Sequence, residues 1–316
     1  MFEKVAVIGA GTLGCGIALS FAMHGHQTIL SDISSESLAI ANKKSEQILA
    51  FFEREGYPLV GSQKEILARL SFISDLEEVA DCDFVTECIV EDLSSKQLLF
   101  QQLDQLCKPD TILATNTSSL RLSDIIERVT RHRSRILLTH WFNPPHIVPL
   151  VELLKGKETS EEVYEQVKQF LEEQNKVTIN VKKEVAGLVA NRIQIAMARE
   201  VLALWSEGVA TASDLDVAIT SGPGFRLATS GLLEIIDFGG ADVWARVLEQ
   251  LQPKIESSKT VNPQLLEQVE TGKYGVKTGE GFFQYPGKSF DEYALDRDTK
   301  LLRQLLQVIS VKEDSR

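Results

Sequence analysis

A histidine and a glutamate stand on either side of a proline-rich turn in the stretch ILLTHWFNPPHIVPLVEL, residues 136–153. His140 ends a short apolar run that is typical of a buried strand, and Glu152 lies in the apolar run after the prolines. If the two strands are neighbours, Glu152 can accept a hydrogen bond from one imidazole nitrogen and leave the other free for proton transfer. The alternative is a satisfied loop histidine beside an ordinary strand glutamate, so the surrounding elements must decide.

A glycine-rich turn near the start of the chain could bind a dinucleotide. The apolar strand expected at residues 3–8 runs directly into Gly9-Ala10-Gly11-Thr12-Leu13-Gly14, and a helical pattern follows up to Gly25. In such a motif the first glycine allows the tight turn, the second lets the backbone approach the pyrophosphate, and the third lets the helix pack against the strand. The helix N-terminus adds unpaired N–H groups that attract phosphate charge.

The next predicted strand, residues 27–32, ends in Asp32, about 20 residues beyond the glycine turn, where dinucleotide-binding units keep an acidic residue. Its carboxylate would accept a hydrogen bond from the ribose 2′-hydroxyl and would repel a 2′-phosphate. The sequence therefore predicts NAD as the cofactor and not NADP.

Alternating elements continue to residue 119. The predicted helices and strands are 34–55 (helix), 63–70 (helix), 71–74 (strand), 83–90 (strand), 93–107 (helix) and 111–119 (strand). Because ligands bind outside the carboxyl ends of strands in an open parallel sheet, the glycine turn, Asp32, Glu91, Asn116, Ser118 and His140 would gather along one edge. This convergence favours a functional His140, whereas Glu91 or Lys96 alone would more simply be a solvated charge.

The character of the chain changes near residue 183. A helix is expected at 159–173 and an extended run at 176–181, whereas helical spacing dominates from residue 185 onward. We therefore expect an α/β domain with a doubly wound parallel sheet at residues 1–183, followed by an all-helical domain at 184–316. The several apolar faces of the helical part favour burial against the first domain or a second subunit.

Composition limits the classes of function. The chain has 316 residues, of which 43% are hydrophobic, and a net charge of -12, which argues against nucleic-acid binding. No signal segment and no run of about 18 apolar residues occurs, so we expect a cytoplasmic protein without a membrane partner. The four cysteines lack metal-ligand spacing, so we expect reduced thiols and no metal site.

Six segments in order carry a resemblance to a known family: GAGTLGCGIA, ECIVEDLSSK, TNTSSL, HWFNPPHIVPLVEL, AGLVANRI and GVKTGEGFFQY. Together they resemble the 3-hydroxyacyl-CoA dehydrogenase family over residues 3–286. The resemblance implies an NAD-binding Rossmann-type domain followed by a helical domain that forms a homodimer interface. It also implies a small-molecule substrate, namely an L-3-hydroxyacyl-CoA, with a short chain such as 3-hydroxybutyryl-CoA.

The resemblance assigns roles by motif position. It implies that His140 is the catalytic base and Glu152 its partner, and that Ser118 and Asn191 polarise the substrate. The implied contacts on the cofactor side, beyond the glycine turn and Asp32, are Glu91, Lys96, Asn116, Asn143 and Lys277. In this scheme His140 removes the hydroxyl proton at C3 while hydride passes from C3 to the nicotinamide.

Three departures concern the substrate. The turn NPPHIVPLVEL is similar to the family branch that contains L-gulonate 3-dehydrogenase and lambda-crystallin as well as to the acyl-CoA branch, whereas GVKTGEGF favours the acyl-CoA branch. The other two departures lie in segments that typical members use for CoA and substrate. The lysine-rich helix pair that holds CoA in typical members reads EQILAFFEREGYPLVGSQKE here, and the family's H-P-M-G-P segment reads GFRLATSGLLEIIDFGG. Arg226 in the second segment is either a structural ion pair or a clamp for a free carboxylate. The alternative substrate is thus a free 3-hydroxy acid of the gulonate, carnitine or 3-hydroxybutyrate type. A protein of another class, which keeps the fold and NAD without catalysis, is a third interpretation.

Overall fold

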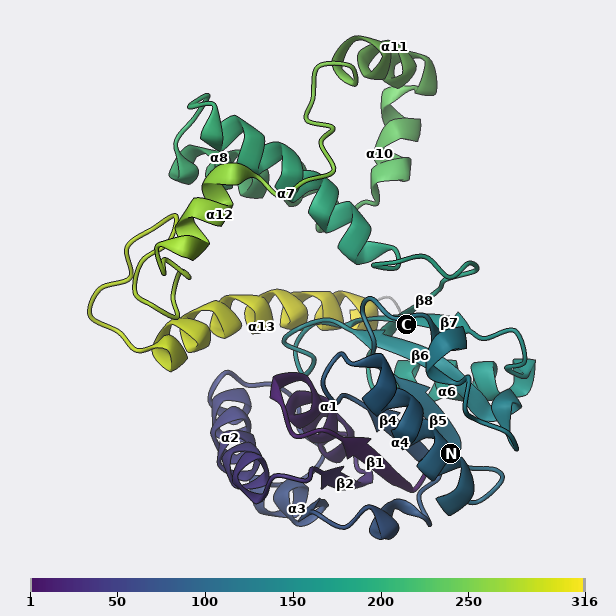
Figure 1. The fold of residues 1–316 in the computed structure, drawn as a ribbon. Coiled ribbons are helices and arrows are strands. Elements are labelled where there is room, and N and C mark those ends of the chain that lie inside the picture. The colour runs from purple at the N-terminus through teal and green to yellow at the C-terminus, as the bar shows by residue number, and fades with distance from the viewer. Residues whose placement is uncertain (1, 315–316) are drawn as a thin grey trace. The chain divides into compact units, whose positions relative to one another are not determined.

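The structure is a computed structural model and describes residues 2–314. The chain forms two compact units: one holds the chain up to Val189 together with the chain from Leu295 onward, and the other is Ala190–Ala294. Figure 1 shows strands and flanking helices in the first unit and helices in the second.

One sheet of eight strands forms the centre of the first unit, in the order β3-β2-β1-β4-β5-β6-β7-β8. The strands are β1 (Lys4–Ile8), β2 (Gln27–Ser31), β3 (Leu70–Ile73), β4 (Phe84–Glu87), β5 (Ile112–Thr115), β6 (Ile136–Trp141), β7 (Leu150–Lys155) and β8 (Val177–Asn180). The first six are parallel and follow the order 3-2-1-4-5-6 of doubly wound dinucleotide-binding sheets. The predicted fold class is therefore confirmed.

The strands β7 and β8 run opposite to the other six. β7 pairs antiparallel with β6, and β8 pairs parallel with β7. The segment 142–149 between β6 and β7 is too short for a parallel crossover, which needs about a dozen residues or more. The proline-rich turn therefore forces the strand that holds Glu152 to fold back beside the strand that holds His140.

Helices cover both faces of the sheet in the first unit. They are α1 (Thr12–Met23), α2 (Ser35–Arg54), α3 (Gln63–Ala68), α4 (Leu93–Leu106), α5 (Leu122–Ile125) and α6 (Glu161–Glu172), with short 3-10 turns at Leu76–Val79 and Arg133–Arg135. Successive side chains of β1 alternate between two cores. Val5 and Val7 pack with α1 and α2, and Ala6 and Ile8 pack with α4. Burial on both faces explains why β1 is apolar without a break from Val5 to Ile8.

The last helix, α13 (Phe290–Asp314), returns to the first unit. Leu302 and Leu305 are buried in the core that contains Val5 and Val7, and Arg303 forms an ion pair with Glu55 at the end of α2. The prediction had grouped all residues beyond 183 in one helical domain. The compact units instead place this helix with the sheet because its apolar face packs there.

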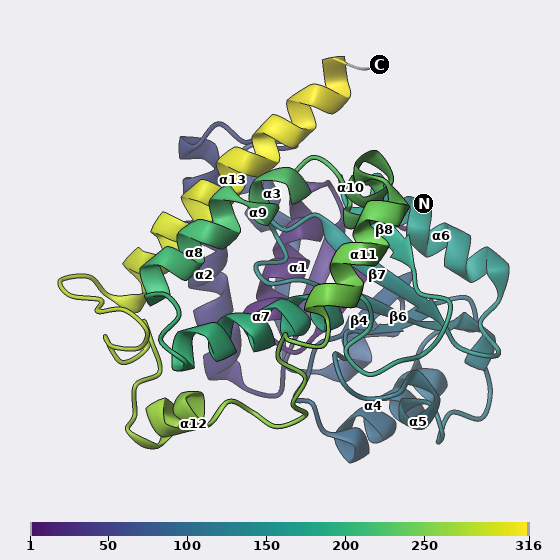
Figure 2. The same cartoon turned by 90° about the horizontal axis from the view of Figure 1, so that it is seen from above.

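The second unit contains α7 (Ala190–Ser206), α8 (Ala212–Ser221), α9 (Pro223–Leu227), α10 (Leu232–Gly239), α11 (Ala241–Leu251) and α12 (Pro263–Glu270). Figure 2 shows these helices from above, in green tones. Large apolar side chains such as Phe225, Leu233 and Phe238 are exposed on this unit. Across residues 2–314, no helix combines the length and the apolar character that a membrane span requires.

Candidate active site

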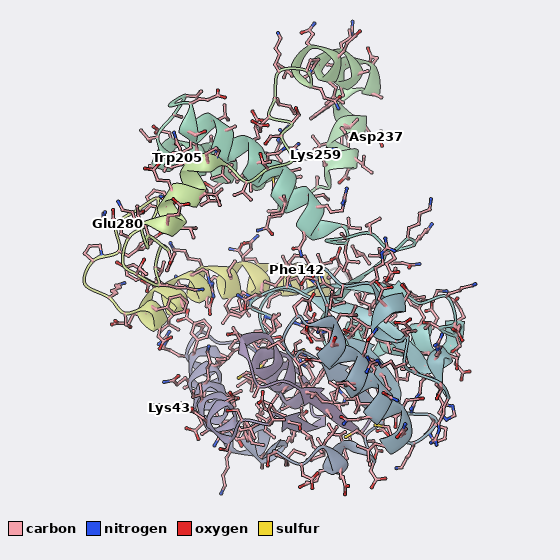
Figure 3. All side chains as sticks on the ribbon, viewed as in Figure 1. Lys43, Phe142, Trp205, Asp237, Lys259 and Glu280 are labelled. Carbon is pink, nitrogen blue, oxygen red and sulfur yellow. The ribbon has the colours of Figure 1, made fainter. Side chains whose placement is uncertain are left out.

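The register of β6 and β7 places His140 directly opposite Glu152. The imidazole Nδ1 lies 2.8 Å from Glu152 Oε2, and the two side chains are 4% and 0% exposed. Because a carboxylate only accepts, Nδ1–H donates to Glu152 and Nε2 is the nitrogen that can take up a proton. The ring of Phe142, labelled in Figure 3, packs edge-on against the imidazole at 5.0 Å.

Ser118 is the hydrogen-bond partner of the second imidazole nitrogen. Its Oγ lies 3.1 Å from His140 Nε2. In the neutral tautomer described above the serine hydroxyl donates to Nε2, and after protonation Nε2–H donates to the serine. The three groups form a chain from Glu152 through the imidazole to Ser118, which is an arrangement for moving one proton at Nε2.

Glu91 holds the loop that carries Ser118. Its Oε1 accepts hydrogen bonds from the Thr117 hydroxyl at 2.5 Å and from the backbone N–H groups of Ser118 and Ser119, both at 3.0 Å. Burial by itself would raise the pKa of Glu91, but the hydrogen bond from Thr117 and the charge of Lys96 outweigh it and lower the pKa to about 2. Glu91 is therefore an anion at all physiological pH values and fixes this loop.

Lys96 lies inside the protein. Its side chain is 1% exposed, and its ammonium lies 2.5 Å from Glu87 Oε1 and 3.3 Å from Glu91 Oε2. Glu87 also accepts hydrogen bonds from the Thr115 hydroxyl and the Ile89 N–H. One cation thus pairs with two carboxylates behind the Ser118 loop. The cofactor contacts that the resemblance implies for Lys96 and Glu91 stay predictions.

Asn116 joins the ends of two strands at the same edge of the sheet. Its Oδ1 accepts a hydrogen bond from the Trp141 N–H at 2.8 Å, and its side chain is 7% exposed. This contact fixes the backbone directly after His140. Asn143, two residues further on, is exposed at the start of the turn, with a cis peptide bond to Pro144.

The glycine turn has the geometry that a pyrophosphate needs. Gly9 has a φ of +107°, and a Cβ at Gly14 would lie 1.8 Å from the Gly9 carbonyl oxygen, so both positions require glycine. A Cβ at Gly11 would meet nothing within 4 Å, and Gly11 caps α1 without a side chain. The backbone at Thr12 and Leu13 therefore opens α1 beside free space, where N–H groups can bind phosphate oxygens.

Asp32 lies directly beside this turn. Its carboxylate accepts hydrogen bonds from the Ala10 N–H at 2.7 Å and the Ser34 N–H at 2.8 Å. The contacts hold an anionic group next to the turn at the carboxyl end of β2. The glycines and Asp32 thus fit an NAD molecule with an unphosphorylated ribose.

Three predicted residues lie in the second compact unit, so their roles stay predictions. Asn191 is the second residue of α7, Lys277 is exposed in a turn, and Arg226 is exposed on α9. Within residues 2–314 the Arg226 guanidinium has no ion-pair partner. Both alternatives for Arg226, the structural ion pair and the carboxylate clamp, stay predictions.

Two partners of the site were missed by the sequence reasoning. The Val189 N–H donates to Glu152 Oε1 at 3.0 Å, so the last residue of the first segment binds the buried carboxylate. A backbone donor cannot be recognised from the residue type. The second missed partner is Glu87, which could have been noticed because it is an acidic residue in the apolar run DFVTECIV.

Comparisons with known proteins match nearly the whole chain. The family model described as "3-hydroxyacyl-CoA dehydrogenase, NAD binding domain" matches residues 4–185, and the corresponding C-terminal domain model matches residues 187–285. A 3-hydroxybutyryl-CoA dehydrogenase of Clostridioides difficile is 34% identical over 287 residues, covering 89% of this chain and 99% of the relative. A 5-formyl-3-hydroxy-2-methylpyridine 4-carboxylate 5-dehydrogenase of Mesorhizobium japonicum is 28% identical over 303 residues, covering 96% and 97%.

Solved structures of related dehydrogenases have a similar fold over nearly the whole chain. The crystal structure of a 5-formyl-3-hydroxy-2-methylpyridine 4-carboxylic acid 5-dehydrogenase, described as an NAD⁺-dependent dismutase, superposes with a TM-score of 0.87 at 28% identity, covering 97% of this chain and 99% of the other. The (S)-3-hydroxybutyryl-CoA dehydrogenase of Ralstonia eutropha superposes with a TM-score of 0.73 at 27% identity, covering 91% and 100%.

Proposed function

Because this chain belongs to the 3-hydroxyacyl-CoA dehydrogenase family, we propose that it uses NAD to oxidise the 3-hydroxyl group of a short L-3-hydroxyacyl-CoA. The observation that carries the proposal is the buried hydrogen-bond chain from Glu152 through His140 to Ser118. That chain leaves one imidazole nitrogen as a base at the sheet edge where dinucleotides bind.

The side chains divide the proton chemistry among them. His140 Nε2 takes the proton from the C3 hydroxyl, and Glu152 stabilises the imidazolium that forms. Ser118 donates a hydrogen bond to the oxygen as negative charge develops on it. The same role for Asn191 is implied by the family resemblance and stays a prediction. NAD, when bound, accepts the hydride from C3. In the reductive direction the imidazolium returns the proton to the same oxygen.

A second candidate substrate is a free hydroxy acid. The exposed Arg226 offers a guanidinium that can bind a carboxylate through two parallel hydrogen bonds. The Mesorhizobium relative, whose name gives a pyridine carboxylate as its substrate, matches nearly the whole chain. These two observations favour a carboxylate in place of the CoA thioester.

A substrate panel separates the two candidates. Acetoacetyl-CoA, acetoacetate and other free 3-keto acids are each supplied with NADH or NADPH, and consumption of the coenzyme is followed by absorbance. We expect the highest kcat/KM with acetoacetyl-CoA and NADH, and a preference for free acids would favour the second candidate. Arg226→Met lowers turnover only if the carboxylate binds there. Turnover that depends on NADPH would contradict the role of Asp32.

The role of His140 is tested on the best substrate of that panel. We expect His140→Ala to bind NADH as the parent enzyme does and to lose about 10² to 10⁴ in kcat, because the general base is gone. Near-normal turnover of this variant would overturn the assignment. Absence of turnover on every substrate, with NADH binding intact, would favour a protein that keeps the fold without catalysis.

A further inference from the structure

A buried lysine lies beneath the turn that joins the two strands of the active site. Lys176 stands between α6 and β8 and is 7% exposed. Its Nζ donates hydrogen bonds to the carbonyl oxygens of Pro145 at 2.6 Å and Val148 at 3.3 Å, and lies 5.1 Å from the centroid of the Trp141 ring. All three partners belong to the segment between His140 and Glu152.

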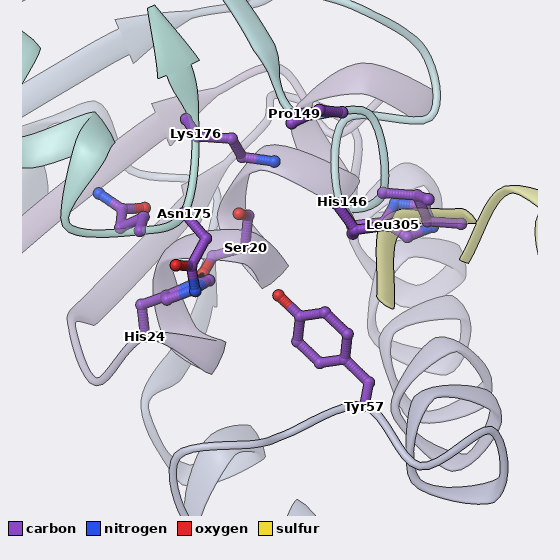
Figure 4. Close-up of a pocket in the computed structure, with 10 residues that line it drawn as sticks. Ser20, His24, Tyr57, His146, Pro149, Asn175, Lys176 and Leu305 are labelled. Atoms are coloured by element: carbon purple, nitrogen blue, oxygen red, sulfur yellow. Dashed lines mark hydrogen bonds between the residues drawn. The ribbon is translucent and has the colours of Figure 1, made fainter. Parts of the chain in front are cut away.

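Among residues 2–314, no carboxylate lies close enough to pair with Lys176. Figure 4 shows its amine pointing into a small pocket that is also lined by Ser20, His24, Tyr57 and His146. The titratable groups that face it are thus two histidines and a tyrosine, and no carboxylate among residues 2–314 forms an ion pair with it. Burial lowers the pKa of Lys176 to about 7. Because burial disfavours the charged form, the contribution of Lys176 here comes from the hydrogen bonds that its amine donates.

The turn depends on such a donor because its own N–H groups do not reach the carbonyls of Pro145 and Val148. The Pro144 carbonyl accepts from the N–H groups of Ile147 and Val148, and the Pro149 carbonyl accepts from Val177. The carbonyls of Pro145 and Val148 receive the amine of Lys176 instead. A buried carbonyl without a donor is unfavourable, so the amine selects this conformation of the turn.

The turn also packs against α1. A Cβ at Gly16 of α1 would lie 2.7 Å from Pro145 Cγ and 2.8 Å from His146 Nδ1, so the helix packs directly against the turn. Lys176 and α1 therefore both hold the segment 143–149. Removal of the amine leaves the carbonyls of Pro145 and Val148 without this donor, although the packing of α1 remains.

We propose that Lys176 is a positioning residue for the His140–Glu152 pair, because its amine fixes the turn that sets where β6 ends and β7 begins. The inference rests on the proposed function of that pair. Lys176 touches neither side chain, and it acts through the Trp141 ring and the turn carbonyls. In active sites a displacement of about 1 Å can lower a rate about 10²-fold.

The experiment is a double-mutant cycle between Lys176→Met and Glu152→Gln. Lys168→Met, an exposed lysine on α6, serves as the matched control. For each protein we would measure kcat, KM for NADH, the NADH dissociation constant and the thermal melt. We expect Lys176→Met to lower kcat about tenfold to a hundredfold with KM for NADH nearly unchanged. In the Glu152→Gln background, the same substitution should have little further effect on kcat.

Each outcome decides a separate point. A kcat of Lys176→Met close to that of the control would overturn the inference, and so would a loss of equal size in both backgrounds, because the lysine would then act independently of the pair. A Glu152→Gln variant with normal kcat would instead overturn the proposed function itself. If Lys176→Met does not melt cooperatively, Lys176→Leu, which likewise lacks a donor, is held to the same criteria. Lys176→Arg, which keeps donors, should recover part of the lost kcat.

Discussion

Replacement of Glu152 by glutamine removes the negative charge of the His140–Glu152 pair, while the side chain keeps nearly the same shape. In the parent enzyme Oε2 accepts the His140 Nδ1–H at 2.8 Å and Oε1 accepts the Val189 N–H at 3.0 Å. An amide offers one oxygen and one NH₂ group, so at one of these positions two donors face each other. If the NH₂ group faces His140, the imidazole must move its proton to Nε2, and the base then points away from the substrate.

The size of the effect follows from the lost ion pair. A carboxylate and an imidazolium with charge centres about 4 Å apart attract by about 4 kcal/mol at an effective dielectric constant of about 20. Since about 1.4 kcal/mol is a factor of ten in rate, the loss corresponds to roughly three decades in kcat. That value lies within the range of about 10² to 10⁴ that general acid–base groups contribute.

The assay compares initial rates of NADH oxidation for Glu152→Gln and for Asp104→Asn. Asp104 is a buried carboxylate that binds Arg135 and the backbone of Arg131 and His132, away from the pair. We expect Asp104→Asn to lower the free energy of unfolding and to keep kcat. A Glu152→Gln variant with nearly parental kcat, or equal losses of kcat in both variants, would refute the reasoning.

Three further perturbations test other parts of the structure. Lys96→Met should lower the free energy of urea unfolding by about 3–5 kcal/mol, because it leaves the buried Glu87 unpaired, whereas Lys168→Met should change it little. Gly11→Ala should keep the melting temperature but weaken NADH binding in a fluorescence titration. Gly14→Ala should lower the melting temperature, because its Cβ would meet the Gly9 carbonyl. Equal behaviour of the two variants would contradict the assignment of the pyrophosphate site. Burial lowers the pKa of His24 to about 4 and that of His146 to about 3, so the folded state keeps both neutral and loses stability as the pH falls below about 6.5. At about pH 5 each histidine costs about 2 kcal/mol, and His146→Phe should remove its share of that pH dependence in urea unfolding.

Much of the fold could be predicted because it depends on local patterns. The apolar strands, the glycine turn and the helix starts are properties of a few neighbouring residues. Strand ends were less predictable: the run 83–90 was expected to be one strand, but β4 ends at Glu87, where the carboxylate turns back to accept the Ile89 N–H. The predicted strand at 111–119 similarly ends at Thr115, because the following loop is held by Glu91.

The remaining parts of the candidate site depend on contacts between distant residues. His140 and Glu152 could be paired in advance because a short turn joins their strands. Lys96 was first read as a solvated charge, and its burial between Glu87 and Glu91 depends on how α4 packs against β4. Val189 and Glu152 are 37 residues apart in the sequence, and the donor is the backbone N–H of Val189. A pattern of residue types therefore cannot predict this contact.

The return of α13 to the first unit has a consequence for biosynthesis. Leu302 and Leu305 complete a core that begins with β1, although almost the whole chain separates them in sequence. The nascent chain therefore carries an open apolar face on the sheet domain while the second unit is being translated. A fragment that ends at Val189 would keep the glycine turn and the His140–Glu152 pair, yet it would expose this face to solvent and to aggregation.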